Sequence, residues 1–218
     1  MTGAVDRLNS IRDGIASAAR LAGRDPADVG LIAVSKGRSA AEIAELLEAG
    51  QRDFGESRVQ EAETKWPDLL ARHSEVRLHG IGRVQTNKAA DAIRLFDVIH
   101  SVDRPSLLDT LVKQAEREQR FPAIYVQVNI GHEEQKGGCP IGQVGELVKA
   151  ARASSLPLEG LMAIPPLGLE PAPFFALLAT IARRHDVVGL SMGMSSDYKA
   201  AVMLGATAVR VGTALFEG

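Results

Sequence analysis

The sequence predicts an α/β protein, a single (β/α)8 barrel of the TIM type with an extra N-terminal helix. Three observations support this prediction: short apolar runs of strand type alternate with longer helical segments, eight such runs occur, and no segment has the composition of an interdomain linker. Alternating strands and helices form a parallel sheet through right-handed crossovers, and eight units suit closure into a barrel. A doubly wound open sheet is the alternative. The length favours one domain, 1–218, near the lower size limit for a barrel.

The first expected element is an amphipathic helix. Apolar residues recur near helical spacing over residues 5–22, so residues 1–28 are expected to form a helical segment that leads into the barrel. Four strand–helix units follow. Their expected strands and helices are 31–35 with 41–50, 52–55 with 57–66, 77–82 with 87–96, and 97–102 with 105–119.

The second half of the chain repeats the same alternation. Its expected strands are 123–130, 158–164, 186–192 and 207–216, and the helices between them are 142–154, 171–185 and 196–205. The stretch richest in proline and glycine, residues 164–173, falls between a strand and a helix, where a loop belongs.

Composition and charge exclude several classes of protein. The net charge of −2 comes from interspersed acids and bases, with no basic stripe of the kind that nucleic acid requires. Charges occur throughout residues 1–20, and no apolar run is long enough to cross a bilayer, so we expect no signal peptide, no membrane span and a cytoplasmic location. Cys139 is the only cysteine, which excludes an internal disulfide and a structural zinc site.

The run LIAVSK ends in Lys36, where the first strand is expected to end. In a barrel this is the C-terminal face, at which active sites are built. An amine in a partly apolar setting favours its neutral form and becomes a nucleophile toward an aldehyde. The alternative is a lysine that extends from the strand end into water. The other six lysines lie in polar or helical surroundings that predict surface charges, namely Lys65, Lys88, Lys113, Lys136, Lys149 and Lys199.

Two loops at the same face have the composition of a phosphate site. The loops at the ends of the seventh and eighth expected strands read SMGMSSD, residues 191–197, and GT, residues 212 and 213. Phosphate sites in barrels commonly form after these two strands. Small residues let the backbone approach an anion, and Ser195 and Thr213 add hydroxyl donors, although ordinary turns have the same composition.

Arg210 lies inside an apolar strand, where an unpaired guanidinium would be costly to bury. Its acceptor is either a ring nitrogen or phosphate of a ligand, or a buried carboxylate such as Asp197 or Glu56. A strand-end lysine, a phosphate cradle and an inward arginine together describe a pocket for a phosphorylated aldehyde. Pyridoxal 5′-phosphate (PLP) has the matching aldehyde, phosphate and pyridine nitrogen.

Eight segments, distributed in order over nearly the whole chain, carry a resemblance. They are AVSK (33–36), FGESRVQE (54–61), HGIGRVQTNK (79–88), HSVDR (100–104), QVNI with the following EEQKGG (127–138), GLMAI (160–164), LSMGMSSDY (190–198) and VRVGTALF (209–216). Together they resemble the YggS/PROSC family of pyridoxal-phosphate-binding proteins, also called PLP homeostasis proteins.

The resemblance implies a single-domain barrel similar to the N-terminal domain of bacterial alanine racemase, with PLP held as a Schiff base on Lys36. It also implies that Arg210 is the partner of the pyridine nitrogen and that Ser195, Gly212 and Thr213 bind the phosphate. We predict no metal site.

The chain departs from the family pattern at two places. The family usually has Asn and Tyr after the Gly-Glu of the second strand, whereas this chain has Ser57 and Arg58, so a contact from that Asn is not carried over. The aromatic residue that the family has between His79 and Ile81 is Gly80 here, which leaves the wall beside the cofactor undefined.

The pocket predicts cofactor binding without robust catalysis. A pyridine nitrogen that accepts from Arg210 makes a weaker electron sink, and racemisation needs a proton donor and an acceptor on opposite faces of the α-carbon. In alanine racemases the second group is a tyrosine from an extra β domain. Tyr125 and Tyr198 are not obvious replacements, and we assign no catalytic residue. His79 and His100 either line the pocket mouth or are satisfied barrel histidines without metal-ligand spacing.

We therefore expect a protein that holds PLP and acts in intracellular vitamin B6 and amino-acid homeostasis. The expected partners are PLP and, for delivery, PLP-dependent apoenzymes, and the expected state is a monomer or a weak homodimer. One alternative is a weak PLP-dependent amino-acid racemase. The other is a Schiff-base aldolase that acts on a phosphorylated sugar without PLP. A bound chromophore separates the aldolase from the first two functions, and amino-acid turnover separates the racemase from the carrier.

Overall fold

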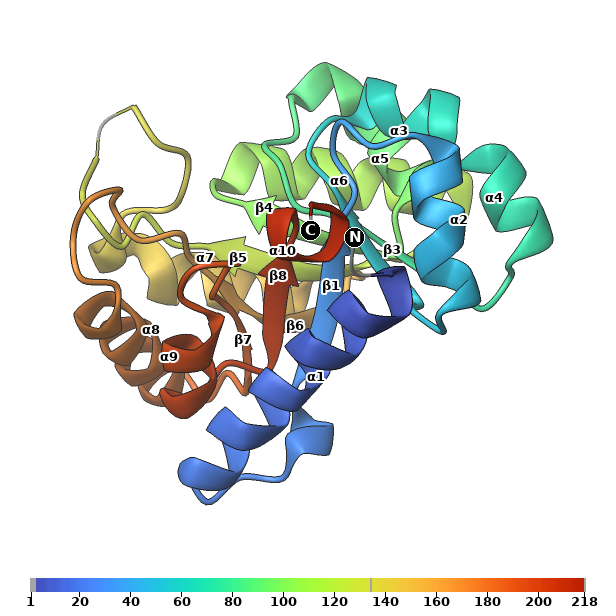
Figure 1. The fold of residues 1–218 in the computed structure, drawn as a ribbon. Coiled ribbons are helices and arrows are strands. Elements are labelled where there is room, and N and C mark those ends of the chain that lie inside the picture. The colour runs from blue at the N-terminus through green and yellow to red at the C-terminus, as the bar shows by residue number, and fades with distance from the viewer. Residues whose placement is uncertain (1–2, 134, 218) are drawn as a thin grey trace.

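A computed structural model of this protein describes residues 3–133 and 135–217. Its eight parallel strands pair in sequence order, and β8 pairs with β1, so the sheet is a closed barrel (Figure 1). The strands are β1 (Gly30–Val34), β2 (Asp53–Glu56), β3 (Arg77–Gly80), β4 (Val98–Val102), β5 (Ala123–Gln127), β6 (Leu158–Met162), β7 (Gly189–Ser191) and β8 (Ala208–Val211). The predicted (β/α)8 fold is confirmed, and the open-sheet alternative is wrong.

Four residues that the sequence analysis included lie outside the described residues. They are Met1, Thr2 and Gly218, at the ends of the expected domain 1–218, and Glu134, in the segment EEQKGG.

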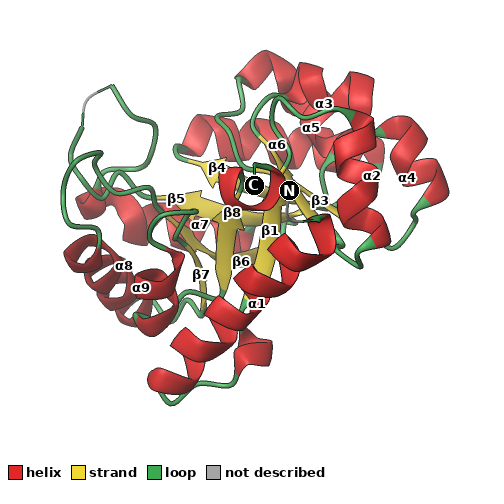
Figure 2. Ribbon diagram, viewed as in Figure 1, coloured by secondary structure: helices red, strands yellow, loops and turns green. Residues whose placement is uncertain are grey.

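Helices surround the strands on the outside of the barrel (Figure 2). They are α1 (Ala4–Leu21), α2 (Ala40–Glu48), α3 (Val59–Lys65), α4 (Pro67–Arg72), α5 (Ala89–Leu95), α6 (Pro105–Glu118), α7 (Val144–Ala153), α8 (Ala172–Arg184), α9 (Tyr198–Met203) and α10 (Thr213–Phe216). Local signals fix several of their ends. At α2, Ser39 Oγ accepts from the backbone N–H of Glu42, and the Glu42 carboxylate accepts from the backbone N–H of Ser39, which is a capping box.

Two short helices differ from the sequence prediction. α4 follows α3 almost directly, because Pro67 cannot continue α3 but suits the first turn of a new helix. The run 207–216, predicted as one strand, divides at Gly212 into β8 and α10. Gly212 has φ −115° and ψ −84°, which is not a strand conformation, so the chain turns there.

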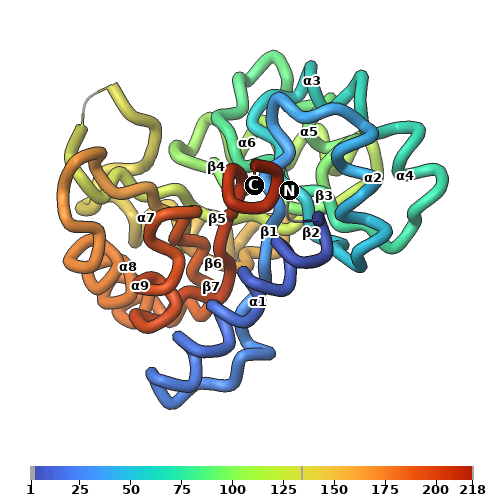
Figure 3. The backbone as a smooth tube through the Cα atoms, in the orientation of Figure 1, coloured from blue at the N-terminus to red at the C-terminus, as the bar shows by residue number. Residues whose placement is uncertain are grey.

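The N-terminal helix closes the outer layer beside the C-terminal segment. α1 packs against α9 and α10, and Arg7 Nε donates to the carbonyl of Leu215 at 2.7 Å. Figure 3 shows the described ends of the chain next to each other. Gly14 makes this approach possible, because a Cβ there would lie 2.2 Å from Tyr198 Oη.

The buried residues form two layers that differ in chemistry. The larger layer lies between the strands and the helices and is apolar. The barrel interior holds a small apolar group of Val98, Tyr125 and Met162 together with buried polar side chains. Barrel interiors are usually filled by branched apolar residues, so the polar side chains call for a physical explanation. Among the described residues, no helix is long and apolar enough to span a membrane.

Candidate functional site

The five residues predicted to bind the cofactor line one cavity of about 450 Å³. It lies at the C-terminal ends of β1, β7 and β8, the face where barrel enzymes carry their sites. Lys36 enters from the turn after β1, Arg210 from β8, and Ser195, Gly212 and Thr213 from the loops that follow β7 and β8. The barrel topology thus brings together residues that are up to 177 positions apart, from 36 to 213, in the sequence.

Lys36 is presented to the cavity by strand alternation. Val34 and Lys36 both line the cavity, whereas Ser35 between them is buried on the outer side and donates to Glu56 Oε1 at 2.6 Å. Glu61 accepts from the backbone N–H of Gly37 at 2.6 Å, so both neighbours of Lys36 are fixed. The Lys36 side chain is exposed and has no hydrogen-bond or ion-pair partner within the described part of the chain.

Lys65 corrects one sequence prediction, since it is not a surface charge. Its side chain is only 9% exposed and forms an ion pair at 2.7 Å with the buried Glu56 carboxylate. It also donates to the carbonyl of Ser35 at 2.7 Å and to Glu61 at 3.0 Å. Helix α3 places this ammonium against the end of β2, so Lys65 supports the turn that carries Lys36.

The two predicted phosphate loops meet each other directly. The backbone N–H of Gly212 donates to Ser195 Oγ at 3.2 Å, which joins the loop after β7 to the end of β8. Within the loop after β7, Gly193 has φ +93° and permits a tight turn, and a Cβ there would lie 2.5 Å from Ala201 Cβ. Ser195 is half-buried and Thr213 is exposed at the cavity, so both hydroxyls are accessible to an anion.

Arg210 is buried, with 4% of its surface exposed, and bonds only neutral acceptors among the described residues. Its Nη1 donates to Ser191 Oγ at 2.6 Å, and its Nη2 donates to the carbonyl of Ala163 at 3.1 Å. Burial lowers the pKa of the guanidinium to about 10, and the charge of nearby Asp197 opposes this shift.

Asp197 and Glu56, the two carboxylates considered as partners of Arg210 in the sequence, bind other groups. Asp197 accepts from the backbone N–H of Met194 at 2.5 Å, and Glu56 pairs with Lys65. Neither forms an ion pair with Arg210 in the part of the chain that the structure describes. A guanidinium has five N–H donors, so this buried cation retains donors at the cavity that it lines. A ligand that presents an acceptor there, such as a pyridine nitrogen, fits it.

The two tyrosines lie away from the cavity. Tyr198 is buried against α1, where its hydroxyl approaches Gly14. Tyr125 lies in the barrel interior toward the opposite mouth, and burial raises the pKa of its phenol. The side chains of His79 and His100 are likewise buried in the barrel and contact each other at 2.9 Å. They are satisfied barrel histidines rather than residues of the pocket mouth.

The departures from the family pattern affect different places. Ser57 lines the cavity, whereas Arg58 lines a separate groove with Arg83 and Lys88. Gly80 does not line the cavity, because its missing side chain would point outward to the ring of Phe96, 2.6 Å from a Cβ. The wall of the cavity therefore does not depend on the side chain at position 80. Ile81, the next residue, faces the cavity instead.

Sequence reasoning missed the apolar walls of the cavity. Ile81 and Ile164 follow β3 and β6, and together with Val34 they provide surfaces suited to a planar ring. Strand alternation was the available signal, because each lies two positions after an inward residue, but only the closed topology shows that the strand ends converge. No group of three metal-ligating side chains occurs in residues 3–133 and 135–217.

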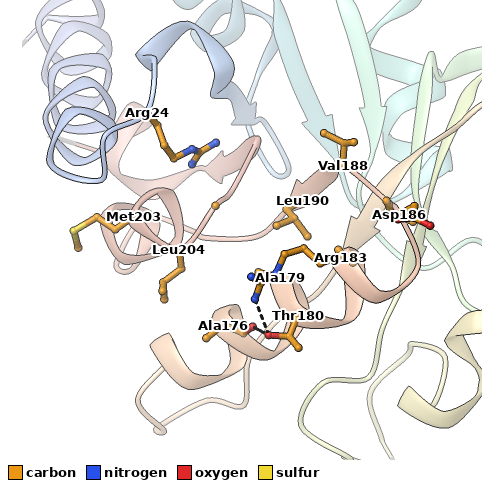
Figure 4. Close-up of a pocket in the computed structure, with 13 residues that line it drawn as sticks. Arg24, Ala176, Ala179, Thr180, Arg183, Asp186, Val188, Leu190, Met203 and Leu204 are labelled. Carbon is orange, nitrogen blue, oxygen red and sulfur yellow. Dashed lines mark hydrogen bonds between the residues drawn. The ribbon is translucent and has the colours of Figure 1, made fainter.

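A larger cavity of about 780 Å³ lies outside the barrel (Figure 4). It is lined by residues of α8, such as Ala176 and Thr180, together with Met203, Leu204 and Val188. Its lining includes none of the residues predicted to bind the cofactor. Size alone therefore does not identify the functional site of this protein.

Comparison with known proteins places the chain in one family. The family described as "Alanine racemase, N-terminal domain" matches residues 7–218 of this chain. A "Pyridoxal phosphate homeostasis protein" of Pseudomonas aeruginosa is 40% identical over 227 residues, which cover 99% of this chain and 96% of that protein.

Two solved structures of PipY from Synechococcus elongatus share the fold. The structure without PLP is 38% identical, with a TM-score of 0.87, and covers 97% of this chain and 99% of its own. The structure described as having PLP bound is 40% identical, with a TM-score of 0.82. The match covers 93% of this chain and 99% of the PipY chain. This chain therefore belongs to the alanine racemase N-terminal domain family and, within it, to the pyridoxal phosphate homeostasis proteins.

Proposed function

We propose that this protein binds PLP in the cavity at the C-terminal end of the barrel and acts in PLP and amino-acid homeostasis without robust catalysis. The observation that carries the proposal is Arg210, a buried guanidinium at the cavity that bonds only neutral acceptors among the described residues. The names of the relatives support the same ligand, since they include PLP homeostasis proteins and a PipY structure with PLP bound.

Each side chain of the cavity has a role toward one part of this ligand. The Lys36 amine would hold the aldehyde carbon. Arg210 donates to the pyridine nitrogen, and Ser195, Gly212 and Thr213 surround the phosphate. When bound, PLP supplies an electrophilic carbon and an electron-withdrawing ring.

The same residues limit turnover. Arg210 is a donor rather than an acid that protonates the ring, so the nitrogen it contacts stays unprotonated and the ring withdraws electrons weakly. Tyr125 and Tyr198 both lie away from the cavity and provide no second proton-transfer group there. These features support a carrier over a racemase.

The proposal extends to the setting in which the protein works. We infer a single domain, with residues 1–28 as its helical lead-in, in a cytoplasmic monomer or weak homodimer that delivers PLP to apoenzymes. The cavity supports delivery, because the Lys36 side chain is exposed there and a ligand bound to it can exchange with the solvent. Incubating the loaded protein with a PLP-dependent apoenzyme, in the presence of a trap for free PLP, tests delivery. Activation that the trap abolishes would contradict direct transfer.

The binding proposal is tested by titrating PLP into the wild type, Lys36→Ala and Lys113→Ala while recording visible absorbance. Lys113 is an exposed lysine of α6 without a cavity contact and serves as the control. We expect a bound chromophore in the wild type and the control and its loss in Lys36→Ala. Absence of the band from the wild type overturns the proposal and favours the sugar aldolase, and rapid amino-acid turnover by the loaded protein favours the racemase.

A further inference from the structure

A continuous chain of hydrogen bonds crosses the barrel interior from Arg210 to the opposite mouth. Ser191 Oγ lies 2.6 Å from Arg210 Nη1 and 2.9 Å from His100 Nδ1. His100 Nε2 lies 2.9 Å from His79 Nδ1, and His79 Nε2 lies 3.0 Å from Asp53 Oδ1. Each of the five residues belongs to a different strand. In the order from Arg210 to Asp53, these strands are β8, β7, β4, β3 and β2.

The hydrogen-bond chain is buried along most of its length. Arg210, Ser191, His100 and His79 are each at most 4% exposed, whereas the Asp53 side chain is 38% exposed. Asp53 lines a cavity of about 280 Å³ at the N-terminal ends of the strands, together with Arg77, Tyr125 and Glu159. The chain therefore joins the candidate cofactor cavity to the solvent-facing mouth at the other end of the barrel.

The chemistry of the groups sets the direction of each hydrogen bond. The Asp53 carboxylate only accepts, so His79 Nε2 carries a proton and donates to it. Burial holds the pKa of His100 well below its usual range, so this ring is neutral and has a single N–H. In the arrangement that places one proton on each ring, His79 Nδ1 accepts from His100 Nε2–H, and His100 Nδ1 accepts from the Ser191 hydroxyl.

These directions determine what Ser191 does for Arg210. The Ser191 hydroxyl gives its single proton to His100, so its lone pairs face Arg210 and accept from Nη1. Tyr125 holds the middle of the chain, because its ring stacks on His100 with centroids 4.4 Å apart and planes 8° from parallel. Arg210 is thus fixed by an oriented acceptor rather than by a carboxylate.

We propose that Ser191 and His100 are positioning residues that hold Arg210 ready to donate to the ring nitrogen of the cofactor. Asp53 orients the same chain from its far end, without contact with the cofactor cavity. The inference rests on the proposed PLP site for its ligand, but the direction of the chain belongs to the protein alone. Interior polar networks of this kind are stable only when every member has its hydrogen-bond partners. Breaking one hydrogen bond in the network is therefore expected to displace the Arg210 side chain.

The first test reads the effect on the cofactor. PLP affinity and the absorbance maximum are measured for Ser191→Ala, His100→Leu and His100→Gln. We expect about tenfold weaker binding and a shifted band for Ser191→Ala and His100→Leu, because a buried donor loses its acceptor. His100→Gln lies closer to the wild type, since an amide can both accept and donate. Ser101→Ala is the matched control, a buried serine of β4 next to His100 that takes no part in the chain.

The second test needs no cofactor. Nitrogen-15 NMR of the imidazoles in the protein without PLP is expected to show the Nε2–H tautomer for both His79 and His100. Asp53→Asn removes the obligatory acceptor, and its amide can donate to His79 Nε2, so we expect the Nδ1–H tautomer to appear in both rings. This isosteric change at the far mouth is also expected to shift the absorbance band of the loaded protein.

The outcomes separate this inference from the proposed function. If the wild type binds PLP and Ser191→Ala and His100→Leu keep wild-type affinity and spectrum, the positioning inference is wrong and the proposed function stands. If the wild type does not bind PLP, the proposed function fails. The histidine tautomers alone then test the inferred direction of the hydrogen bonds. An Nδ1–H tautomer in either wild-type ring overturns the inferred direction. Should His100→Leu fail to fold, the Asp53→Asn measurements decide the question.

Discussion

Single residues with a charge in an apolar setting identified the site, and two other buried residues, Lys65 and His100, make predictions about stability. Lys36 and Arg210 stood out in the sequence because each charge falls in a strand-like apolar run. Lys65 gave no such signal, since its helix looks like any surface helix, and only the packing of α3 shows that it is buried. The His79–His100 contact was equally hidden, because two residues of adjacent strands meet only once the register is known.

Removing Lys65 is expected to destabilise the protein. Lys65→Ala leaves the fully buried Glu56 carboxylate without its cation, and breaking a buried pair costs about 3–5 kcal/mol. Chemical denaturation measures this loss of unfolding free energy, with Lys113→Ala as the exposed control, expected to change by less than about 0.5 kcal/mol. A loss of that small size for Lys65→Ala as well would show that the ion pair is not formed.

Burial of His100 predicts a pH dependence of stability. Its pKa is lowered in the folded protein, so below about pH 6.5, the usual histidine value, the unfolded chain binds a proton that the folded chain does not. The contribution is complete above that pH and is lost as the pH falls, at up to about 1.4 kcal/mol per pH unit. Denaturation of the protein without PLP between pH 7 and 5 measures this slope. His100→Gln should reduce it, while His73→Gln, at a partly exposed site, is the control.

At the scale of elements, hydrophobic periodicity predicted the long helices and the strands but not the two short helices. α4 and α10 span only six and four residues, too few for a helical period to be recognised. The turn at Gly212 was equally invisible, because its neighbours continue the apolar run of β8. Yet this turn brings the N–H of Gly212 to Ser195, so an element boundary that periodicity missed shapes the cavity.

The outer face of β3 is expected to reject an aromatic side chain. In Gly80→Phe the new ring would displace Phe96, because a Cβ already lies 2.6 Å from that ring, and overpacking costs about 1–3 kcal/mol. Thermal unfolding measures the loss, and the absorbance of bound PLP should stay unchanged because position 80 faces away from the cavity. A changed spectrum with unchanged stability would show that position 80 faces the cofactor.

At the scale of the whole molecule, the count of eight strand–helix units favoured the closed barrel, and the pairing of β8 with β1 decided it against the open sheet. The cavity walls followed only from closure, since Val34, Ile81 and Ile164 come from three strands that the sequence does not place relative to one another. The polar chain through the interior also needs closure, because β4 and β7 are joined by no direct strand pairing and meet across the barrel through His100 and Ser191.

Ligand binding is expected to stabilise the whole barrel. A ligand that binds only the folded state raises the unfolding free energy by about 2.7 kcal/mol at a free concentration 100 times Kd. Thermal unfolding with PLP should therefore show a higher Tm, and pyridoxal, which lacks the phosphate, should give a smaller shift at equal concentration. Equal shifts with the two compounds would remove Ser195, Gly212 and Thr213 from the proposed phosphate site.

The central claim is that Lys36 holds PLP in this cavity, and the most direct measurement is the position of the cofactor after chemical trapping. The PLP-loaded wild type is reduced with borohydride, digested, and the modified lysine is identified by mass spectrometry. The account predicts one modified residue, Lys36. A label found mainly on another lysine, or spread over several surface lysines, would contradict it.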